Sequence, residues 1–339
     1  MTTRRSFLRE CAALAAGAPV LGAPVPERAN AAAKPGPPRR SASGSQRRWR
    51  VAFGLNGFMS SESVFGKTFP IWEVLAFAER EGFEAIELVE GWPKGCGLYP
   101  DPDDDARIAG VKDLCRRYGV KPFSIQTGAA GAFRKDRSAR EAWLRQFAGW
   151  ARFARKAGCE CIGTWPGGDL DGQTIDEAID VFAGTLREVA KIVSDEELLC
   201  SVEIEPPFVF NRIEHLVRIV DGAGHPLVKG MYDPSHFDLM DGSRGKPHEL
   251  LERFGVQRVG YVHFTDTDGT IFQGTSKHLP CGDGHIDVRR SLEVLWDGGY
   301  EGWIMIDAWM TEDPYDACRK GKAAIEAARR EFAKRLSGT

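Results

Sequence analysis

The sequence lacks three features that would direct it to common functional classes. It has no Cys-x-x-Cys pair and only 7 histidines. It also has no large excess of charge of either sign, because 45 Lys and Arg residues nearly balance 48 Asp and Glu residues, for a net charge of −3. Without the cysteine pair, a zinc knuckle is not expected. The near-neutral balance argues against DNA or RNA as the main partner. The scarcity of histidine argues against a cluster of several zinc ions held mainly by imidazoles.

The N-terminal region lacks an apolar stretch long enough to span a bilayer comfortably, but it carries a targeting pattern. Paired arginines precede Phe and Leu in Thr3-Arg-Arg-Ser-Phe-Leu-Arg9, and a small-residue cleavage site, Ala29-Asn-Ala31, follows an Ala-rich stretch. We expect residues 1–33 to be a cleavable twin-arginine signal peptide and residues 34–48 a disordered linker. The protein would then be periplasmic or extracellular and would meet a membrane only during export. The alternative is a basic disordered tail.

Beyond residue 49, no shift in composition marks a second domain. Short β-rich runs alternate with amphipathic stretches, clearest at 71–81, 141–157, 175–192, 213–220 and 314–335. Eight such pairs predict a single (β/α)8 TIM barrel over residues 49–339. The expected strands are 50–55, 85–90, 122–127, 160–165, 199–205, 227–233, 258–264 and 302–307.

Four side chains of metal-ligand type stand at or near the ends of four successive expected strands: Glu205, Asp233, His263 and Asp307. The gaps are 28 (233−205), 30 (263−233) and 44 (307−263) residues. A strand with its returning helix takes about 30 residues, so the last gap holds one unit plus a long loop. In a closed barrel all four side chains would converge at the C-terminal mouth. Three carboxylates and one imidazole suit a hard or borderline divalent cation.

Glu203 and Glu205 lie two residues apart and face the same side of their strand. Pro206 and Pro207 end the strand beside Glu205, so we assign Glu205 to the metal and place Glu203 one layer deeper. A lone acidic residue at a strand end is more often a helix cap or a solvated loop acid. Four such residues at matching positions of consecutive units favour a shared site.

Three further residues near the expected mouth can bind substrate. His236, in Asp233-Pro-Ser-His236, can bind substrate or a second ion, and Asp266 can accept a hydrogen bond from a ligand histidine or a substrate hydroxyl. Trp165 begins a loop at the mouth and offers an apolar face to a sugar ring, although a lone aromatic residue there more often belongs to core or rim packing. The glycines of the loop 279–287 can bring backbone N–H groups close to a ligand.

Residues 50–335 resemble the sugar phosphate isomerase/epimerase family, the xylose isomerase-like TIM barrels that include AP endonuclease-type proteins. The resemblance rests on Glu-Pro after the fifth strand, Asp-x-x-His after the sixth, Val-His-x-x-Asp at the seventh, and the loop Gly-x-Gly-x-Ile-Asp. Glu-Leu at the second strand, which contains Glu87, is also typical. These motifs are more specific for the barrel and its metal than for a substrate.

The resemblance implies one divalent ion, most often manganese, with zinc, magnesium or cobalt as alternatives, held by Glu205, Asp233, His263 and Asp307. Glu205 and Asp307 would form an acid/base pair, in which one removes a proton beside the carbonyl of a keto-sugar and the other returns it. The ion would polarise the carbonyl and stabilise the enediolate. His236 matches a substrate-binding position, and Glu87 joins the expected substrate-binding residues.

Two departures from the family pattern stand out. Asp307 replaces the usual Glu, and the shorter side chain draws its carboxylate back by roughly 1.5 Å, about the length of one methylene. The arginine that often follows the seventh-strand histidine is missing, and Lys277 or His278 are candidates to replace it.

The sequence therefore predicts a metal-dependent isomerase or epimerase of a free sugar. The same proton abstraction would serve a lyase or hydrolase of 3-keto-glycosides. Two other classes compete: an AP endonuclease-like phosphodiesterase, and a catalytically silent sugar-binding barrel. Whether the chain forms a homo-oligomer is left open.

Overall fold

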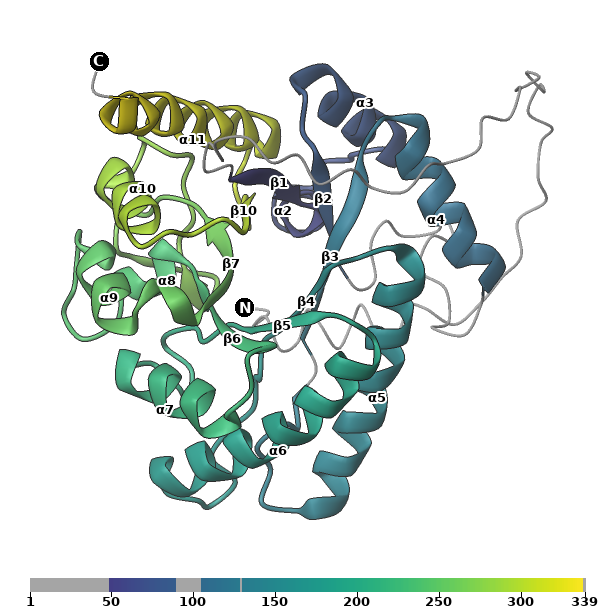
Figure 1. Cartoon of the computed structure of the whole chain (residues 1–339), viewed down its shortest axis with the longest axis vertical. Coiled ribbons are helices and arrows are strands. Elements are labelled where there is room, and N and C mark those ends of the chain that lie inside the picture. The colour runs from purple at the N-terminus through teal and green to yellow at the C-terminus, as the bar shows by residue number, and fades with distance from the viewer. Residues whose placement is uncertain (1–48, 90–104, 129, 338–339) are drawn as a thin grey trace.

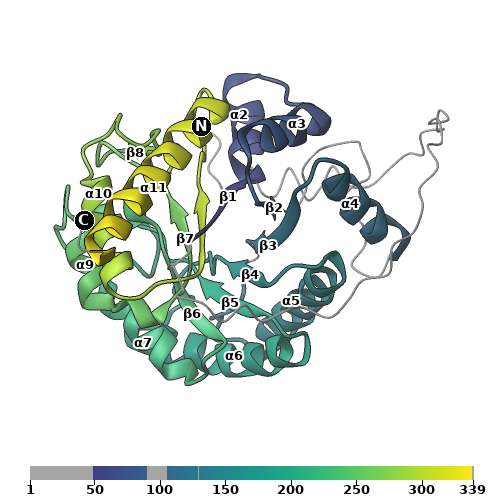
Figure 2. The same cartoon turned by 45° about the horizontal axis from the view of Figure 1, so that its top comes forward.

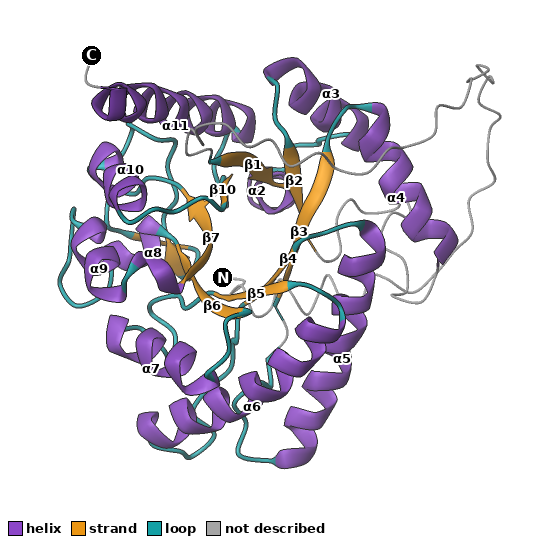
Figure 3. Ribbon diagram, in the orientation of Figure 1, coloured by secondary structure: helices purple, strands orange, loops and turns teal. Residues whose placement is uncertain are grey.

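The computed structural model describes residues 49–89, 105–128 and 130–337. Eight parallel strands close into a barrel in the order β1-β10-β7-β6-β5-β4-β3-β2, and helices surround it (Figures 1 and 3). The predicted TIM barrel is confirmed. The expected signal peptide and linker, residues 1–48, lie outside the described residues, and within those residues no helix is long and apolar enough to cross a membrane.

Each of the eight barrel strands overlaps one of the eight that the sequence pattern predicts, although the fifth ends at Val202 rather than at residue 205. They are β1 (Arg50–Gly54), β2 (Ala85–Val89), β3 (Lys121–Thr127), β4 (Cys161–Thr164), β5 (Leu199–Val202), β6 (Val228–Tyr232), β7 (Val259–Phe264) and β10 (Trp303–Ile306). The helices are α2 (Leu55–Phe65), α3 (Ile71–Glu81), α4 (Asp105–Arg117), α5 (Arg137–Ala157), α6 (Ile175–Asp195), α7 (Ile213–Ala223), α8 (Pro234–Asp238), α9 (Pro247–Phe254), α10 (Val288–Asp297) and α11 (Pro314–Ser337).

The long helices begin and end where their sequences provide caps. Thr174 and Glu177 form a capping box at the start of α6, and Asp136 accepts hydrogen bonds from two backbone N–H groups at the start of α5. Gly82 and Gly158 end α3 and α5 with φ of 68° and 89°, a conformation that a side chain disfavours. Between these caps, each helix buries one apolar face against the barrel.

The interior of the barrel is filled with side chains in layers. The part farther from the C-terminal ends of the strands is apolar and consists of Ala52, Ala85, Phe123, Cys161, Met231, Tyr261, Trp303 and Met305. Side chains on a strand alternate between the interior and the helices, so the residue two positions further along faces the interior one layer higher. From Met231, Tyr261 and Met305 this step leads to Asp233, His263 and Asp307. The polar site therefore lies directly on an apolar floor.

The 44-residue gap between His263 and Asp307 contains the long loop that its length predicts. A two-stranded hairpin of β8 (Ile271–Phe272) and β9 (Thr275–Ser276) lies within it, before α10. Figure 2 shows this segment on the same side of the molecule as α10 and α11. The sequence pattern did not reveal the hairpin, because two-residue strands are too short for a period to appear.

Candidate metal centre at the barrel mouth

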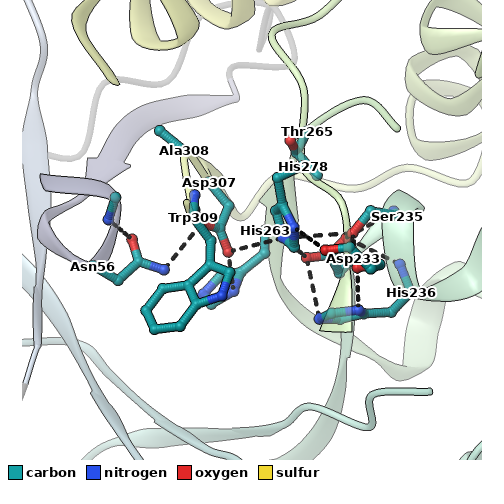
Figure 4. Close-up of polar contacts among 12 residues, drawn as sticks. Asn56, Asp233, Ser235, His236, His263, Thr265, His278, Asp307, Ala308 and Trp309 are labelled. Carbon is teal, nitrogen blue, oxygen red and sulfur yellow. Dashed lines mark hydrogen bonds and ion pairs between the residues drawn. The ribbon is translucent and has the colours of Figure 1, made fainter. Parts of the chain in front are cut away.

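Four ligand-type side chains are brought together by the ends of four strands. Glu203, Asp233 and Asp307 each directly follow a strand, namely β5, β6 and β10, and His263 is the last residue but one of β7. One ligand atom from each of the four lies within 4.8 Å of the others. All four side chains are at most 4% exposed. Figure 4 shows three of them, Asp233, His263 and Asp307, converging from neighbouring strands.

Carboxylates contact both ring nitrogens of His263. Its Nδ1 lies 3.1 Å from Oε1 of Glu203 and 3.3 Å from Oδ2 of Asp307. Its Nε2 lies 2.9 Å from Oε1 of Glu87, which reaches the ring from β2 on another part of the barrel wall. A ring held at Nε2 by a carboxylate can present Nδ1 to an ion.

The structure differs from the sequence-based prediction at one carboxylate, because Glu203 rather than Glu205 belongs to the four-residue cluster. The backbone N–H of Glu203 donates to the carbonyl of Thr164 at 2.9 Å, so the β5 ladder continues to residue 203 and holds this side chain level with the other ligands. Glu205 faces the same side one step further along the chain, where it accepts a hydrogen bond from the hydroxyl of Thr275.

A second group of potential ligands shares Asp233 and adds His236 and His278. Oδ2 of Asp233 lies 3.4 Å from Nε2 of His278 and 3.7 Å from Nε2 of His236. Among the described residues, this buried oxygen has no hydrogen-bond donor in good geometry. A buried carboxylate oxygen left in this state is expected to receive a cation or a proton.

The electrostatics of the cluster favour an ionised Glu203 beside protonated His236 and His263. Burial opposes protonation of His236, but the charges of Asp233, Glu205 and Glu203 outweigh it and raise its pKa to about 9. Burial likewise opposes protonation of His263, yet Glu87 and Glu203 raise its pKa well above the ordinary value. Burial would raise the pKa of Glu203, but His263 and His236 hold it well below its usual range.

This donor set fits a divalent ion. Imidazole nitrogen with carboxylate oxygen suits zinc, manganese and similar ions, and Oδ2 of Asp233, which has no hydrogen-bond donor among the described residues, can serve as the ligand atom of that residue. Binding of an ion would displace protons from the histidines that coordinate it, because ligand histidines must be neutral.

Comparison with known proteins places the chain in a family. Residues 75–334 match the profile described as xylose isomerase-like TIM barrel. The chain belongs to this family.

Curated relatives of this xylose isomerase-like barrel include inosose dehydratases and sugar epimerases. It is 31% identical to inosose dehydratase of Bacillus licheniformis over 114 residues, which are 30% of this chain and 36% of the relative. It is 23% identical to L-ribulose-5-phosphate 3-epimerase UlaE of Escherichia coli over 274 residues, which are 78% of this chain and 93% of the relative. For the first three curated relatives, the match spans only 36%, 49% and 49% of their length.

Solved structures share the fold. The IOLI protein with a binding zinc atom superposes with a TM-score of 0.66 at 15% identity, covering 84% of this chain and 98% of that one. The 3-keto-D-glucoside 4-epimerase YcjR of E. coli gives a TM-score of 0.61 at 16% identity, covering 83% and 100%. At these identities the likeness establishes the barrel alone.

Within this xylose isomerase-like barrel, Asp266 does not face the ligand cluster. It is fully buried, and its two carboxylate oxygens accept the backbone N–H groups of Thr267, Gly282, Gly284 and Ile286 at 2.8 to 3.1 Å. The N–H groups of the Gly-x-Gly loop, expected to approach a ligand, are thus directed at Asp266. Asp266 therefore stabilises the loop through these hydrogen bonds, instead of making the predicted contact with a ligand histidine or a substrate.

The other predicted substrate-binding residues divide into two groups. His236 and His278 are buried in the second ligand group, so His278 does stand beside the site. Lys277 instead pairs with Asp268 and is 38% exposed. Trp165 is buried with its ring 5.1 Å from that of Phe208. Glu87 is 1% exposed and contacts His263, so it lies behind a ligand rather than toward a substrate.

Sequence reasoning missed several residues that orient these ligands. Oδ1 of Asp307 accepts hydrogen bonds from Nδ2 of Asn56 at 3.0 Å and from the backbone N–H of Trp309 at 2.9 Å, which turns Oδ2 toward the cluster. Gln126 donates to Oε2 of Glu203 at 2.8 Å. The expected strand 122–127 contains Ser124 and Thr127 as well as Gln126, so polarity alone did not single out Gln126. No local signal joined Asn56 to Asp307, 251 residues away.

Proposed function

We propose that this protein is a metal-dependent enzyme that removes and returns a proton next to the carbonyl of a sugar, as an epimerase or isomerase. The observation that carries this proposal is the buried cluster of Glu203, Asp233, His263 and Asp307, with a further carboxylate, Glu205, beside it. Sugar epimerases among the relatives support the same chemistry.

Glu203, Asp233, His263 and Asp307 would hold the ion, and His236 and His278 supply further ligand positions. When bound, the ion polarises the substrate carbonyl as a Lewis acid. Glu205 lies beside the four-residue cluster, and its carboxylate would take the proton from the carbon next to the carbonyl. The C–H electron pair then forms the C=C bond of an enediolate, and the C=O electron pair moves onto the carbonyl oxygen. Asp307, after taking up a proton from solvent, would return it to the opposite face or to the neighbouring carbon, where the C=C electron pair forms the new C–H bond.

Charge favours an unphosphorylated substrate. Five carboxylates are buried at the site: Glu87, Glu203, Glu205, Asp233 and Asp307. In the described part of the chain, Glu87, Glu203, Asp233 and Asp307 form ion pairs with histidines. A phosphate group would add like charge to such a site, whereas hydroxyls and a carbonyl can bind without that repulsion.

β-Elimination is the second candidate, because inosose dehydratases are among the relatives. After the same proton is removed, the electron pair forms a C=C bond and expels a hydroxyl or glycosyloxy group from the β-carbon, and that group takes up a proton. Epimerisation and elimination thus share their first step and differ in whether the β-substituent leaves.

The test incubates the protein with added MnCl2 in D2O and uses NMR to measure deuterium incorporation into the substrates. The substrates are the ketohexoses D-fructose, D-tagatose and D-psicose and a 3-keto-glucoside. We expect metal-dependent exchange by the native protein, and Glu205→Gln to slow it by about 100-fold or more. Glu79→Gln, an exposed change on α3, is the control and should match the native protein.

The outcomes separate the competing functions. Binding of sugar without any exchange would indicate a silent sugar-binding barrel, and cleavage of an abasic-site oligonucleotide would indicate a phosphodiesterase. Loss of the β-substituent from the 3-keto-glucoside would favour the lyase. Exchange that persists in Glu205→Gln would contradict the assignment of Glu205 as the base.

A further inference from the structure

The hairpin of β8 and β9 carries two adjacent hydroxyls into the site. Thr275 and Ser276 are 0% and 1% exposed, although the hairpin begins at Ile271, which is 49% exposed. Neighbouring residues of a strand point to opposite sides, so the two hydroxyls reach different partners. Their partners come from the segments that follow β5 and β6.

Thr275 contacts the carboxylate outside the four-residue cluster. Its hydroxyl donates a hydrogen bond to Oε1 of Glu205, and a carboxylate can only accept in such a pair. Both side chains are at most 1% exposed, so water does not compete for this contact. Hydrogen bonds to an ionised group in a buried setting are stronger than those between neutral groups.

Ser276 makes a parallel contact with the second ligand group. Its hydroxyl lies 2.8 Å from Nδ1 of His236 and 2.8 Å from Oγ of Ser235. The backbone carbonyl of Ser276 lies 3.0 Å from Nδ1 of His278. The hairpin therefore touches Glu205 and both added histidines, while the barrel strands hold the four-residue cluster. Orientation of the groups around the cluster depends on this hairpin.

We propose that Thr275 is a positioning residue for the reaction, which acts by fixing the carboxylate of Glu205 at the angle needed for proton transfer. The proposal rests on the proposed function, in which Glu205 removes the proton. Glu205 follows the end of β5, and a glutamate side chain has several rotatable bonds, so an anchor limits the positions that it samples. Displacing a reacting group by about 1 Å can cost about 100-fold in rate.

The alternative is a purely structural hydroxyl that satisfies a buried carboxylate. Such a role predicts that its loss lowers folding stability or metal content and affects catalysis only through them. A positioning role predicts a fall in kcat at unchanged KM, because the interaction serves the reacting geometry rather than the binding of the substrate. A hydroxyl that touched the substrate would instead raise KM.

The experiment compares Thr275→Val, Thr275→Ser and Thr270→Val in the full chain loaded with MnCl2. Valine keeps the shape but removes the hydroxyl, serine restores the hydroxyl, and Thr270 is an exposed threonine at the base of the same hairpin. We expect Thr275→Val to lower kcat for the best of the four sugars by about 10- to 100-fold with KM within about twofold. Thr275→Ser should stay within about threefold of the native protein, and Thr270→Val should match it.

Metal content by mass spectrometry and the melting temperature of each variant are measured alongside. Three results for Thr275→Val would overturn the proposal. They are an unchanged kcat, a loss of activity that parallels a loss of bound metal, and a raised KM with an unchanged kcat. Should the valine variant fail to fold, Thr275→Ala removes the same hydroxyl. If the native protein exchanges no proton with any sugar, the proposed function fails and this inference with it. If Glu205→Gln is inactive but Thr275→Val is not, the inference alone fails.

Discussion

At the scale of single residues, the site is built from ligands that are themselves held by second partners. Glu87 contacts Nε2 of His263 at 2.9 Å, Gln126 contacts Glu203 at 2.8 Å, and Asn56 contacts Asp307 at 3.0 Å. Each contact occupies the atom that faces away from the cluster. The remaining atom of each ligand is thereby directed inward, which prepares the site for an ion before one arrives.

Glu87 provides a direct test of this arrangement. Glu87→Gln removes the negative charge that stabilises the Nε2–H form of His263. It also puts an amide group where Oε2 of Glu87 is buried and has no hydrogen-bond partner among the described residues. We expect the affinity for Mn²⁺ or Zn²⁺ to fall by about 10- to 100-fold. Competition with a fluorescent chelator measures it, with Glu79→Gln as the control. Unchanged affinity would show that Glu87 does not orient the ligand.

At the scale of elements, the loop after β7 is held by a buried carboxylate at its base. Asp266 and Leu279 exchange two backbone hydrogen bonds, of 3.0 and 2.8 Å, and the Asp266 carboxylate accepts four more from backbone N–H groups. A Cβ on Gly284 would lie 2.2 Å from Oδ1 of Asp266, so this close approach requires glycine. The hairpin that carries Thr275 therefore depends on Asp266.

Asp266→Ala should destabilise the protein and loosen the hairpin. The change leaves four backbone N–H donors without their acceptor, and two of these donors, those of Thr267 and Ile286, belong to buried residues. We expect a loss of at least about 2 kcal/mol in the free energy of unfolding. Urea denaturation measures this loss. Asp283→Asn, which removes an exposed ion pair with Lys320, should cost less than about 1 kcal/mol. Equal losses in the two variants would contradict the role given to Asp266.

At the scale of the whole molecule, the metal-free protein contains a buried cluster of opposite charges that depends on pH. The folded-state pKa of His236 is raised to about 9, so its stabilising effect is fully present below about 6.5 and disappears as the pH rises through about 9. Burial would raise the pKa of Asp233, but His236 and His278 lower it to about 2, so its effect is present above about 4 and disappears below.

We therefore expect the chelator-treated protein to be most stable between about pH 4 and 6.5 and to lose on the order of 2–3 kcal/mol between pH 6.5 and 9. The Mn²⁺-loaded protein should show the opposite trend, because deprotonated histidines bind the ion better. Melting temperatures across this range, with and without EDTA, measure both trends. A metal-free protein whose stability is flat from pH 6.5 to 9 would contradict the charge state assigned to the cluster.

The sequence pattern by itself determined the barrel. Alternating β-rich and amphipathic runs predict all eight strands, because each strand must be apolar toward its neighbours and each helix along one face. The same pattern brings Asp233, His263 and Asp307 to one mouth, since residues at equivalent ends of parallel strands share one rim.

Tertiary structure alone decided the choice between Glu203 and Glu205. Alternation fixes the face to which a side chain points but not its depth, and depth depends on where the β5 ladder ends against Thr164 of the neighbouring strand. The same holds for Glu87 and His263, which are 176 residues apart, and for Asp266, whose oxygens are taken by its own loop. Hydrogen bonds between distant segments depend on three-dimensional register, which local periodicity does not encode.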